Sequence, residues 1–318
     1  MKGCFLKTLL SATFLGSVVS QTLKILTVIL SVCNSPASIS PLNAQKVLTS
    51  NTNSVMNLGR HCSHGLLKMN TLVVPFVVQI PCPSAMSDCG TSTGDWADRA
   101  DDAIRRYSMI RVDDYDYRVY VLPEGCLFAG LGNIGPCEGG PCRVWINGKE
   151  SSEPGVYLHE IGHNLGLLHG GYKGDPYGDM SDMMGYCCQS RCFNAGNSKK
   201  LGFTKANAIF TIPFERTNVG EMRLLPNEYI QVDDPKTLIH WYIQNRQSEG
   251  LDIVPEGFGD SVNIYSMEFY GNASNTNTNK RSLLMGRLKM NGENFSLLGV
   301  FSVTMTDMIG GVARVVID

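Results

Sequence analysis

Three histidines and one glutamate lie close together in this chain, at the spacing that a catalytic zinc ion requires. The segment reads His159-Glu160-Ile161-Gly162-His163-Asn164-Leu165-Gly166-Leu167-Leu168-His169. On a helix, residues four apart lie on one face about one turn from each other, so His159 and His163 can direct ring nitrogens at one point. This pair would supply two of the ligands of a metal ion.

His169 becomes a third ligand only if the helix ends before it. Six further helical residues would carry it about 9 Å along the axis and onto another face. Gly166 supplies the end, because glycine adopts the left-handed conformation without a Cβ clash and lets the chain turn back. Three protein ligands leave a fourth position for water, and Glu160 is placed to take the proton of that water and pass it to a leaving amine. The segment therefore indicates hydrolysis of a peptide bond.

Other roles for histidine fit this segment poorly. It holds three of the six histidines of the chain, and a closed structural zinc site would need a fourth cysteine or histidine ligand. The isolated pair His61 and His64 is interpreted as packed or solvent-facing. Three imidazoles also accept copper, cobalt or manganese, and zinc is favoured by fit and availability.

Together with the residues that follow it, the segment resembles the metzincin metallopeptidases, in which His-Glu-x-x-His-x-x-Gly-x-x-His precedes a methionine turn. Among these, the chain is similar to the gametolysin family of algal and related extracellular metalloendopeptidases. The likeness runs from about Thr71 to the C-terminus and is strongest from His159 to Phe203. Beyond the zinc motif, it is carried by Tyr177-Gly178-Asp179-Met180-Ser181-Asp182-Met183-Met184-Gly185-Tyr186-Cys187-Cys188, by Arg191-Cys192-Phe193-Asn194-Ala195 and by Lys200-Leu201-Gly202-Phe203.

The resemblance implies one catalytic Zn2+ and two further site residues. Met184 would lie beneath the metal as an apolar floor, with Met180 and Met183 as neighbouring alternatives, and such a thioether supports the ligands by packing. Tyr186 stands where some metzincins carry a tyrosine that contacts the metal or the oxyanion. The other interpretation of Tyr186 is a half-buried side chain with its hydroxyl in water.

The N-terminal residues indicate export. An apolar stretch over residues 9–23, preceded by basic residues, is typical of a secretory signal, and we assign residues 1–33 to this leader. Cleavage after Ser20 and cleavage near Cys33 both fit, and an uncleaved membrane anchor is the alternative. No later stretch is long and apolar enough to span a bilayer, so no membrane span is expected after signal removal.

The cysteine content agrees with an oxidising compartment. Of eleven cysteines, nine remain once Cys4 and Cys33 are assigned to the leader, which is an odd number. The unpaired thiol would be Cys62, which could occupy the open zinc position from a prosegment and keep the enzyme latent, or pair with another chain or another cysteine. The others are expected to form a Cys82–Cys89 loop and three bridges, in undetermined order, among Cys126, Cys137, Cys142, Cys187, Cys188 and Cys192.

The elements after the leader predict an α+β catalytic domain. Residues 34–70 are polar and aperiodic, and are interpreted as a linker or short prosegment. The catalytic domain, residues 71–205, is expected to run strand, helix, strand, strand, helix. The strands are expected at 71–80, 115–122 and 142–146, and the helices from Asp95 to Tyr107 and from Ser152 and Pro154 onward. The resemblance implies a metzincin-like mixed twisted sheet, in which 142–146, or the loop before it, lines the substrate cleft.

A change of pattern after about Phe203 predicts a second domain over residues 206–318. Short alternating runs separated by Gly, Asn and Asp turns indicate an all-β, sandwich-like fold. Asn272 and Asn294 begin acceptor sequences for N-glycosylation. The polar run 275–279 is interpreted as a loop tip, and the domain either binds matrix or carbohydrate or only supports the catalytic domain.

Composition restricts the partners. The chain of 318 residues is 43 % hydrophobic and 18 % charged, with a formal net charge of −2, and has no basic run interleaved with aromatic residues. These values are ordinary for a globular extracellular enzyme and exclude nucleic acid as an expected partner.

The leading hypothesis is a secreted zinc metalloendopeptidase. The resemblance implies protein or glycoprotein substrates in an extracellular matrix or cell wall, and cleavage within the substrate chain. The alternative is a catalytically idle matrix or cell-surface binding protein that retains the metalloprotease fold. The intact Glu160 argues against this alternative, because a degenerate site commonly loses its base first.

Overall fold

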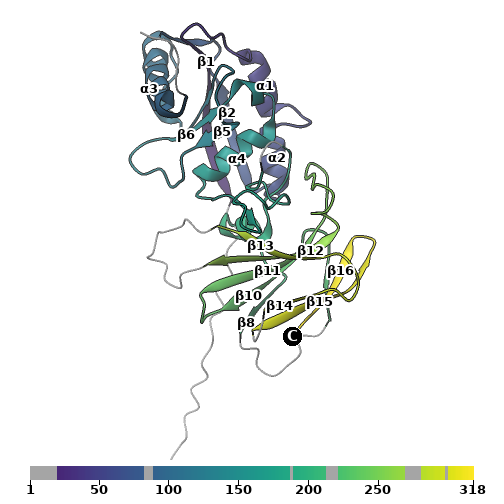
Figure 1. Ribbon diagram of the computed structural model, residues 1–318. Helices are drawn as coiled ribbons and strands as arrows, with labels where there is room; N and C mark the ends of the chain where they lie inside the picture. The colour runs from purple at the N-terminus through teal and green to yellow at the C-terminus, as the bar shows by residue number, and fades with distance from the viewer. Residues whose placement is uncertain (1–19, 82–88, 187–188, 213–220, 269–280, 298–299) are drawn as a thin grey trace, which may run out of the picture.

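The structure is a computed structural model that describes residues 20–81, 89–186, 189–212, 221–268, 281–297 and 300–318. One sheet with its helices forms one end of the molecule, and the sheets of the C-terminal half form the other (Figure 1). The chain is of mixed α and β structure, as its sequence predicts. In the ranges given above, no helix is long and apolar enough to cross a membrane.

The N-terminal sheet is built around a long buried strand, β1. Its strands lie in the order β2-β1-β4-β6-β5, with β3 also paired to β1, and all pair in parallel except β5, which runs antiparallel to β6. Their bounds are β1 Gln21–Val32, β2 Leu67–Val73, β3 Val78–Ile80, β4 Tyr117–Val121, β5 Gly130–Gly132 and β6 Cys142–Ile146. β5 is therefore an edge strand, and it lies in the loop that precedes β6.

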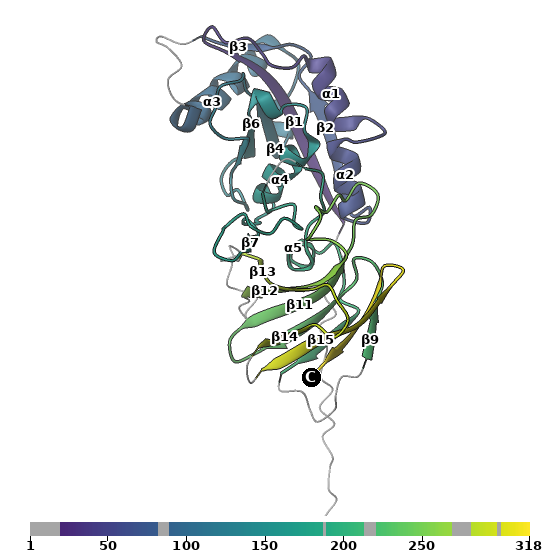
Figure 2. The same cartoon turned by 45° about the vertical axis from the view of Figure 1, so that its right-hand side comes forward.

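Helices cover both faces of this sheet. α1, α2 and α4 share a hydrophobic cluster with one face, which includes Ile25 and Ile29 of β1. α3 shares another cluster with Leu26 and Val28 on the opposite face, and Figure 2 shows α3 on one side of the sheet and α1 and α2 on the other. The helices are α1 Pro41–Thr49, α2 Val55–Cys62, α3 Cys89–Tyr107 and α4 Pro154–Asn164, with short 3-10 turns η1 Val112–Asp114 and η2 Gly148–Glu150.

The expected leader boundary at residue 33 is wrong. Residues 1–19 lie outside the described part of the chain, but Gln21–Val32 is the strand on which the sheet is assembled. A strand buried on both faces is apolar at nearly every position, because neither face meets water. The apolar core of a secretory signal has the same composition. Cleavage near Cys33 would remove β1, whereas cleavage after Ser20 would leave it intact.

Residues 34–70 are not the aperiodic linker or short prosegment that the sequence predicts. This segment holds α1, α2 and the start of β2. Ser40 and Ser54 cap the two helices, because each side chain accepts the backbone N–H three residues later, at 3.3 Å and 3.2 Å. The expected strand 71–80 is divided between β2 and β3, and Pro75, which has no N–H to donate to a ladder, lies in the gap.

Two sheets of the C-terminal half share one hydrophobic cluster. Their strand orders are β7-β13-β12-β11-β10-β8 and β14-β15-β16-β9. Alternate residues of β10 and β11, such as Val232 and Trp241, meet Phe301 and Val303 of β15 in that cluster, because successive side chains of a strand point to opposite faces. The strands are β7 Gly171–Tyr172, β8 Ala208–Thr211, β9 Glu221–Leu224, β10 Tyr229–Asp234, β11 Ile239–Arg246, β12 Ser261–Glu268, β13 Leu283–Leu288, β14 Asn294–Leu297, β15 Phe301–Ile309 and β16 Val312–Ile317.

Two elements join the halves of the molecule. α5, Ala195–Lys200, packs Ala195 against Tyr242 and Tyr265 of the six-stranded sheet. β7, just after the zinc motif, pairs with β13. The segment between α4 and α5 therefore contacts both halves. Asn272 lies outside the described residues, as does the run 275–279, whereas Asn294 begins β14 and is exposed.

Candidate metal centre

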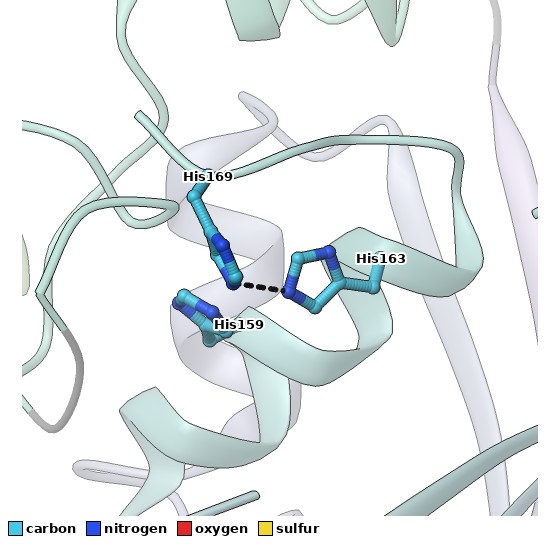
Figure 3. A group of neighbouring side chains, drawn as sticks. All are labelled: His159, His163 and His169. Atoms are coloured by element: carbon cyan, nitrogen blue, oxygen red, sulfur yellow. Dashed lines mark hydrogen bonds between the residues drawn. The ribbon is translucent and has the colours of Figure 1, made fainter. Parts of the chain in front are cut away.

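Helix α4 carries the first two histidines of the motif. Pro154 stands at its first turn, as expected, although Glu153 rather than Ser152 occupies the N-cap position. Every residue of α4 is buried, so the helix is held on all sides by the protein. His159 and His163 lie one turn apart on this helix (Figure 3). Their rings are 5.0 Å apart between centroids.

Gly166 ends the helix and reverses the chain. Its φ is +88°, which is the left-handed conformation that the sequence predicts for this residue. The Leu167 N–H reaches back to the Gly162 carbonyl at 3.0 Å, and the Gly166 N–H to the His163 carbonyl at 2.8 Å. These bonds close the C-terminus of α4. The loop that follows then brings His169 over the helix, facing the two other rings (Figure 3).

The three imidazoles converge. One nitrogen of each ring lies within 4.8 Å of the others, and Nε2 of His163 is 2.9 Å from Nε2 of His169. Two nitrogens bound to one zinc ion at ~2.1 Å and a tetrahedral angle lie about 3.4 Å apart. The donors, one pair of which is 2.9 Å apart and all of which lie within 4.8 Å of one another, therefore bracket the spacing that a single cation requires.

Backbone carbonyls orient two of the rings. Nδ1 of His159 donates to the Met183 carbonyl at 2.8 Å, and Nδ1 of His163 donates to the Leu167 carbonyl at 2.9 Å. A carbonyl only accepts, so the proton of each ring is on Nδ1 and the lone pair is on Nε2. This is the arrangement in which an outer hydrogen bond presents a histidine to a metal.

Burial keeps the rings neutral. It lowers the pKa of His159 to about 3, with a further contribution from the charge of His163, and it lowers the pKa of His169 to about 4. The pKa of His163 is lowered for the same reason, against the bond to the Leu167 carbonyl. Neutral imidazoles at neutral pH are the form that binds a metal ion.

Glu160 faces the same cavity as the three histidines. The cavity has a volume of about 480 Å3, and Glu160 lies almost completely buried beside it. Burial raises the pKa of this carboxyl to about 8. A carboxyl tuned toward neutrality suits proton transfer in both directions at physiological pH.

Strand β5 forms the wall next to Glu160. A Cβ on Gly130 would lie 2.6 Å from Cγ and Oε1 of Glu160, and one on Gly132 would lie 2.7 Å from the Glu160 carbonyl oxygen. Only glycine permits this approach of strand and helix. The cavity is lined by Leu127, Phe128, Ala129, Gly130, Leu131, Gly132, Ile134, His159, Glu160, His163, His169, Tyr177 and Tyr186. Of the two segments expected to line the substrate cleft, the loop before 142–146 lines this cavity, whereas no residue of 142–146 is among its described lining residues.

Met184 is completely buried beneath the helix. A Cβ on Gly162 would lie 2.6 Å from its sulfur, so the thioether packs against α4 between the turns that carry His159 and His163. Met183 is buried too and contributes its carbonyl to His159, whereas Met180 is only partly buried. Met184 thus lies against the turns of α4 that carry His159 and His163, and its role as the apolar floor of a metal site stays a prediction.

Two tyrosines lie at the cavity. Tyr186 is 64 % exposed and lines its rim. The Tyr177 ring lies against His169, with 3.9 Å between ring centroids and 34° between ring planes, and burial and the charge of Glu160 raise the pKa of Tyr177. Sequence reasoning missed Tyr177 as a site residue. The one signal in the sequence was the position of Tyr177 at the start of the segment 177–188, which carries the family resemblance. Only the folded loop shows that the rings of Tyr177 and His169 meet.

Cys62 is not a free thiol. It forms a disulfide with Cys192, 130 residues away, which joins α2 to the segment before α5. The interpretation of Cys62 as a latency thiol is therefore wrong for this fold. The other described bridges are Cys89–Cys126 and Cys137–Cys142. Cys89 is thus not paired with Cys82, which lies outside the described residues, as do Cys187 and Cys188.

Comparisons with known proteins agree with this geometry. Over 105 residues, the chain is 32 % identical to an autolysin of Chlamydomonas reinhardtii, a match that covers 30 % of this chain and 16 % of that protein. A solved structure of a chaperone-substrate complex matches 49 % of this chain and 27 % of its own at 18 % identity, and its TM-score of 0.29 is too low to support an argument. The model of the gametolysin peptidase M11 family matches residues 22–247, more than two thirds of the chain. This chain therefore belongs to the gametolysin peptidase M11 family.

Proposed function

We propose that this protein is a zinc metalloendopeptidase, with His159, His163 and His169 as metal ligands and Glu160 as general base. One observation carries the proposal: three ring nitrogens and one carboxyl converge on a single cavity in a chain of a peptidase family. The match to the autolysin covers a small part of that protein. The activity of the autolysin therefore enters as support for this proposal alone.

A divalent cation in this site would polarise the substrate carbonyl and lower the pKa of a water molecule. The chain supplies the rest of the reaction. The Met183 and Leu167 carbonyls hold His159 and His163 in the binding tautomer. Glu160 takes the proton from the attacking water and delivers it to the nitrogen of the leaving amine. Tyr177 supports His169 by ring contact, and an inward rotation of Tyr186 from the rim would bring its hydroxyl toward a developing oxyanion.

The free edge of β5 fits an extended peptide. Among the strands that the structure describes, β5 pairs with β6 alone, so the backbone groups on its other edge can pair with a substrate strand. Leu127, Leu131 and Ile134 line the cavity and remain exposed. They favour apolar substrate side chains. An extended chain laid along a strand edge is cleaved internally, which supports endopeptidase activity.

Export and extracellular substrates complete the proposal. The Cys62–Cys192, Cys89–Cys126 and Cys137–Cys142 disulfides support an oxidising compartment. A leader would end before β1, because β1 belongs to the folded sheet. Family membership supports glycoproteins of a cell wall or extracellular matrix as substrates. We further propose a metzincin-like catalytic domain followed by a sandwich-like C-terminal domain, with the boundary near residue 206.

The test compares wild type with Glu160→Ala. Both proteins should bind zinc, because the ligands are intact, but only wild type should cleave a denatured protein chain into internal fragments. A chelator should abolish this cleavage, and added zinc should restore it. Glu153→Ala, an exposed glutamate at the start of the same helix, is the matched control and should behave as wild type. Equal cleavage by wild type and Glu160→Ala would refute the proposal, and no cleavage by either would favour the idle binding protein.

A further inference from the structure

We propose that the ion pair of Arg246 and Asp252, in the C-terminal half of the chain, positions the ligand His159. His159 is a ligand only under the proposed function, so the inference rests on it. Neither Arg246 nor Asp252 is among the described residues that line the cavity. Both act through backbone groups, and they are positioning residues rather than catalytic ones.

The pair is completely enclosed by protein. Arg246 ends β11 and Asp252 lies in the loop after it, and their side chains are 1 % and 3 % exposed. Nη2 of Arg246 donates to Oδ1 of Asp252 at 2.9 Å, and Nη1 donates to Oδ2. A planar guanidinium that meets a carboxylate through two parallel bonds has a fixed orientation. The pair is therefore a rigid point of attachment.

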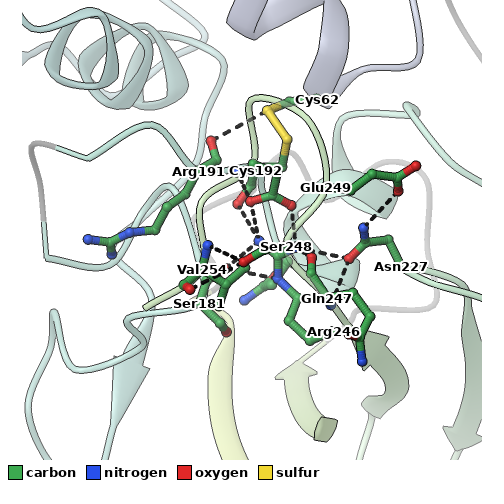
Figure 4. Close-up of polar contacts among 12 residues, drawn as sticks. Cys62, Ser181, Arg191, Cys192, Asn227, Arg246, Gln247, Ser248, Glu249 and Val254 are labelled. Carbon is green, nitrogen blue, oxygen red and sulfur yellow. Dashed lines mark hydrogen bonds and ion pairs between the residues drawn. A yellow bond between two sulfur atoms is a disulfide. The ribbon is translucent and has the colours of Figure 1, made fainter. Parts of the chain in front are cut away.

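This rigid pair holds two separate points of the segment under the metal centre. Nε and Nη2 of Arg246 both donate to the Ser181 carbonyl, at 3.1 Å and 2.7 Å. Oδ1 of Asp252 accepts the Cys192 N–H at 2.8 Å. Figure 4 shows Ser181 and Cys192 brought to the Arg246 side chain from a part of the chain far from it in sequence.

The carbonyl that orients His159 lies between these two points. Met183 is two residues after Ser181, and its N–H donates to the Cys192 carbonyl at 3.0 Å. Its own carbonyl accepts Nδ1 of His159 at 2.8 Å. Arg246 and Asp252 thus fix Met183 from both sides, and Met183 fixes the ring. The disulfide of Cys192 to Cys62 anchors the same backbone to α2.

Stability alone is a weak reason for this arrangement. Well-packed apolar residues often replace a buried ion pair without loss of stability, because the desolvation of two charges offsets their attraction. What an apolar pair does not supply is donors and acceptors at fixed places. Loss of an outer hydrogen-bond partner of a metal ligand costs about 10- to 100-fold in metal affinity, and the Arg246–Asp252 pair lies one step further out.

The decisive variant is Arg246→Met with Asp252→Asn in the full chain. It removes both charges of the pair together, and the Asn oxygen can still accept the Cys192 N–H. The matched control is Arg118→Met with Asp101→Asn. Arg118 and Asp101 form another buried ion pair, 5 % and 2 % exposed, which joins β4 to α3 on the opposite face of the sheet from α4.

Two measurements separate positioning from general stability. The zinc dissociation constant, from competition with a chromophoric chelator, should rise about 10-fold in the Arg246/Asp252 variant and stay unchanged in the control. In metal-free protein, nitrogen NMR of the His159 ring should show the Nδ1–H tautomer in wild type and in the control, and a tautomer mixture in the variant. Unchanged affinity and tautomer in the variant, or equal losses in both double variants, would overturn the inference.

A conservative variant covers the case in which the double variant does not fold. Arg246→Lys keeps the charge but lacks the planar fork that reaches Ser181 and Asp252 together. Its zinc affinity should fall between those of wild type and the double variant, and wild-type affinity would overturn the inference. If wild type itself binds no zinc, the proposed function fails instead, so the two failures are distinguishable.

Discussion

Gly130→Ala is expected to displace the carboxyl of Glu160, the proposed general base, without changing a proposed metal ligand. The added Cβ would lie 2.6 Å from Cγ and Oε1 of Glu160, where ordinary contact begins at 3.4 Å. β5 cannot retreat easily, because Gly130 is paired with Ile146 of β6. The side chain of Glu160 must therefore move by about 0.8 Å, the difference between these two distances.

The size of the effect follows from this displacement. A misplacement of about 1 Å costs about 100-fold in rate, which lies within the 10²- to 10⁴-fold range that positioned proton transfer contributes. We expect kcat/KM to fall about 100-fold, which corresponds to about 2.7 kcal/mol of transition-state stabilisation. Zinc affinity should not change, because the three histidines and their carbonyl partners are intact.

The assay is steady-state cleavage of an internally quenched peptide, with the zinc dissociation constant measured in parallel. Gly140→Ala is the matched control: it lies in the same connection between β5 and β6, and a Cβ there meets nothing within 4 Å. Glu160→Ala sets the lower limit of activity. Wild-type kcat/KM in Gly130→Ala would refute the reasoning, and a parallel loss of zinc would show that the ligands, not the base, had moved.

Three further outcomes are expected. Replacing Cys62 and Cys192 by serine should lower the free energy of unfolding, measured by urea denaturation, by about 4–5 kcal/mol, the loop-entropy value for a bridge this long. The replacement should not raise the peptidase activity. A rise in activity would revive the latency hypothesis. In metal-free protein, the free energy of unfolding of wild type relative to Glu160→Gln should fall as pH rises from about 4.5 to about 8, because the carboxyl with its raised pKa stabilises the folded state only while it is protonated. Urea denaturation of both proteins across this pH range measures the difference. A difference that does not change with pH would contradict the prediction. Met184→Ala should lower the free energy of unfolding, measured by thermal denaturation, by about 2–5 kcal/mol, and Met184→Leu should restore most of this loss. A loss below about 1 kcal/mol would mean that the neighbouring side chains relax to fill the cavity left by Met184.

The short-range features of the site could be predicted from the sequence. His159 and His163 lie together because the helical repeat places them so, and Gly166 turns the chain because no side chain opposes a positive φ. Each of these arguments involves residues a few positions apart. The roles of these residues in catalysis remain predictions.

The long-range features could not be predicted. Residues 21–32 have the apolar composition of a signal, and only their burial between two layers of helices identifies them as a strand. Cys62 has a partner 130 residues away, and no spacing rule connects them. The short helices in residues 34–70 are held by capping serines and by packing on the sheet rather than by a clear apolar period.

The identities and local spacing of the motif residues were sufficient to specify a helix with two converging histidines, its glycine stop and the carboxyl beside it, because backbone geometry over one or two turns depends on neighbouring residues. Folding was needed to bring the Arg246–Asp252 pair to Ser181 and Cys192, and to lay the glycines of β5 against Glu160. These contacts join segments tens of residues apart. Their partners are selected by the packing of whole sheets and helices, which no local pattern encodes.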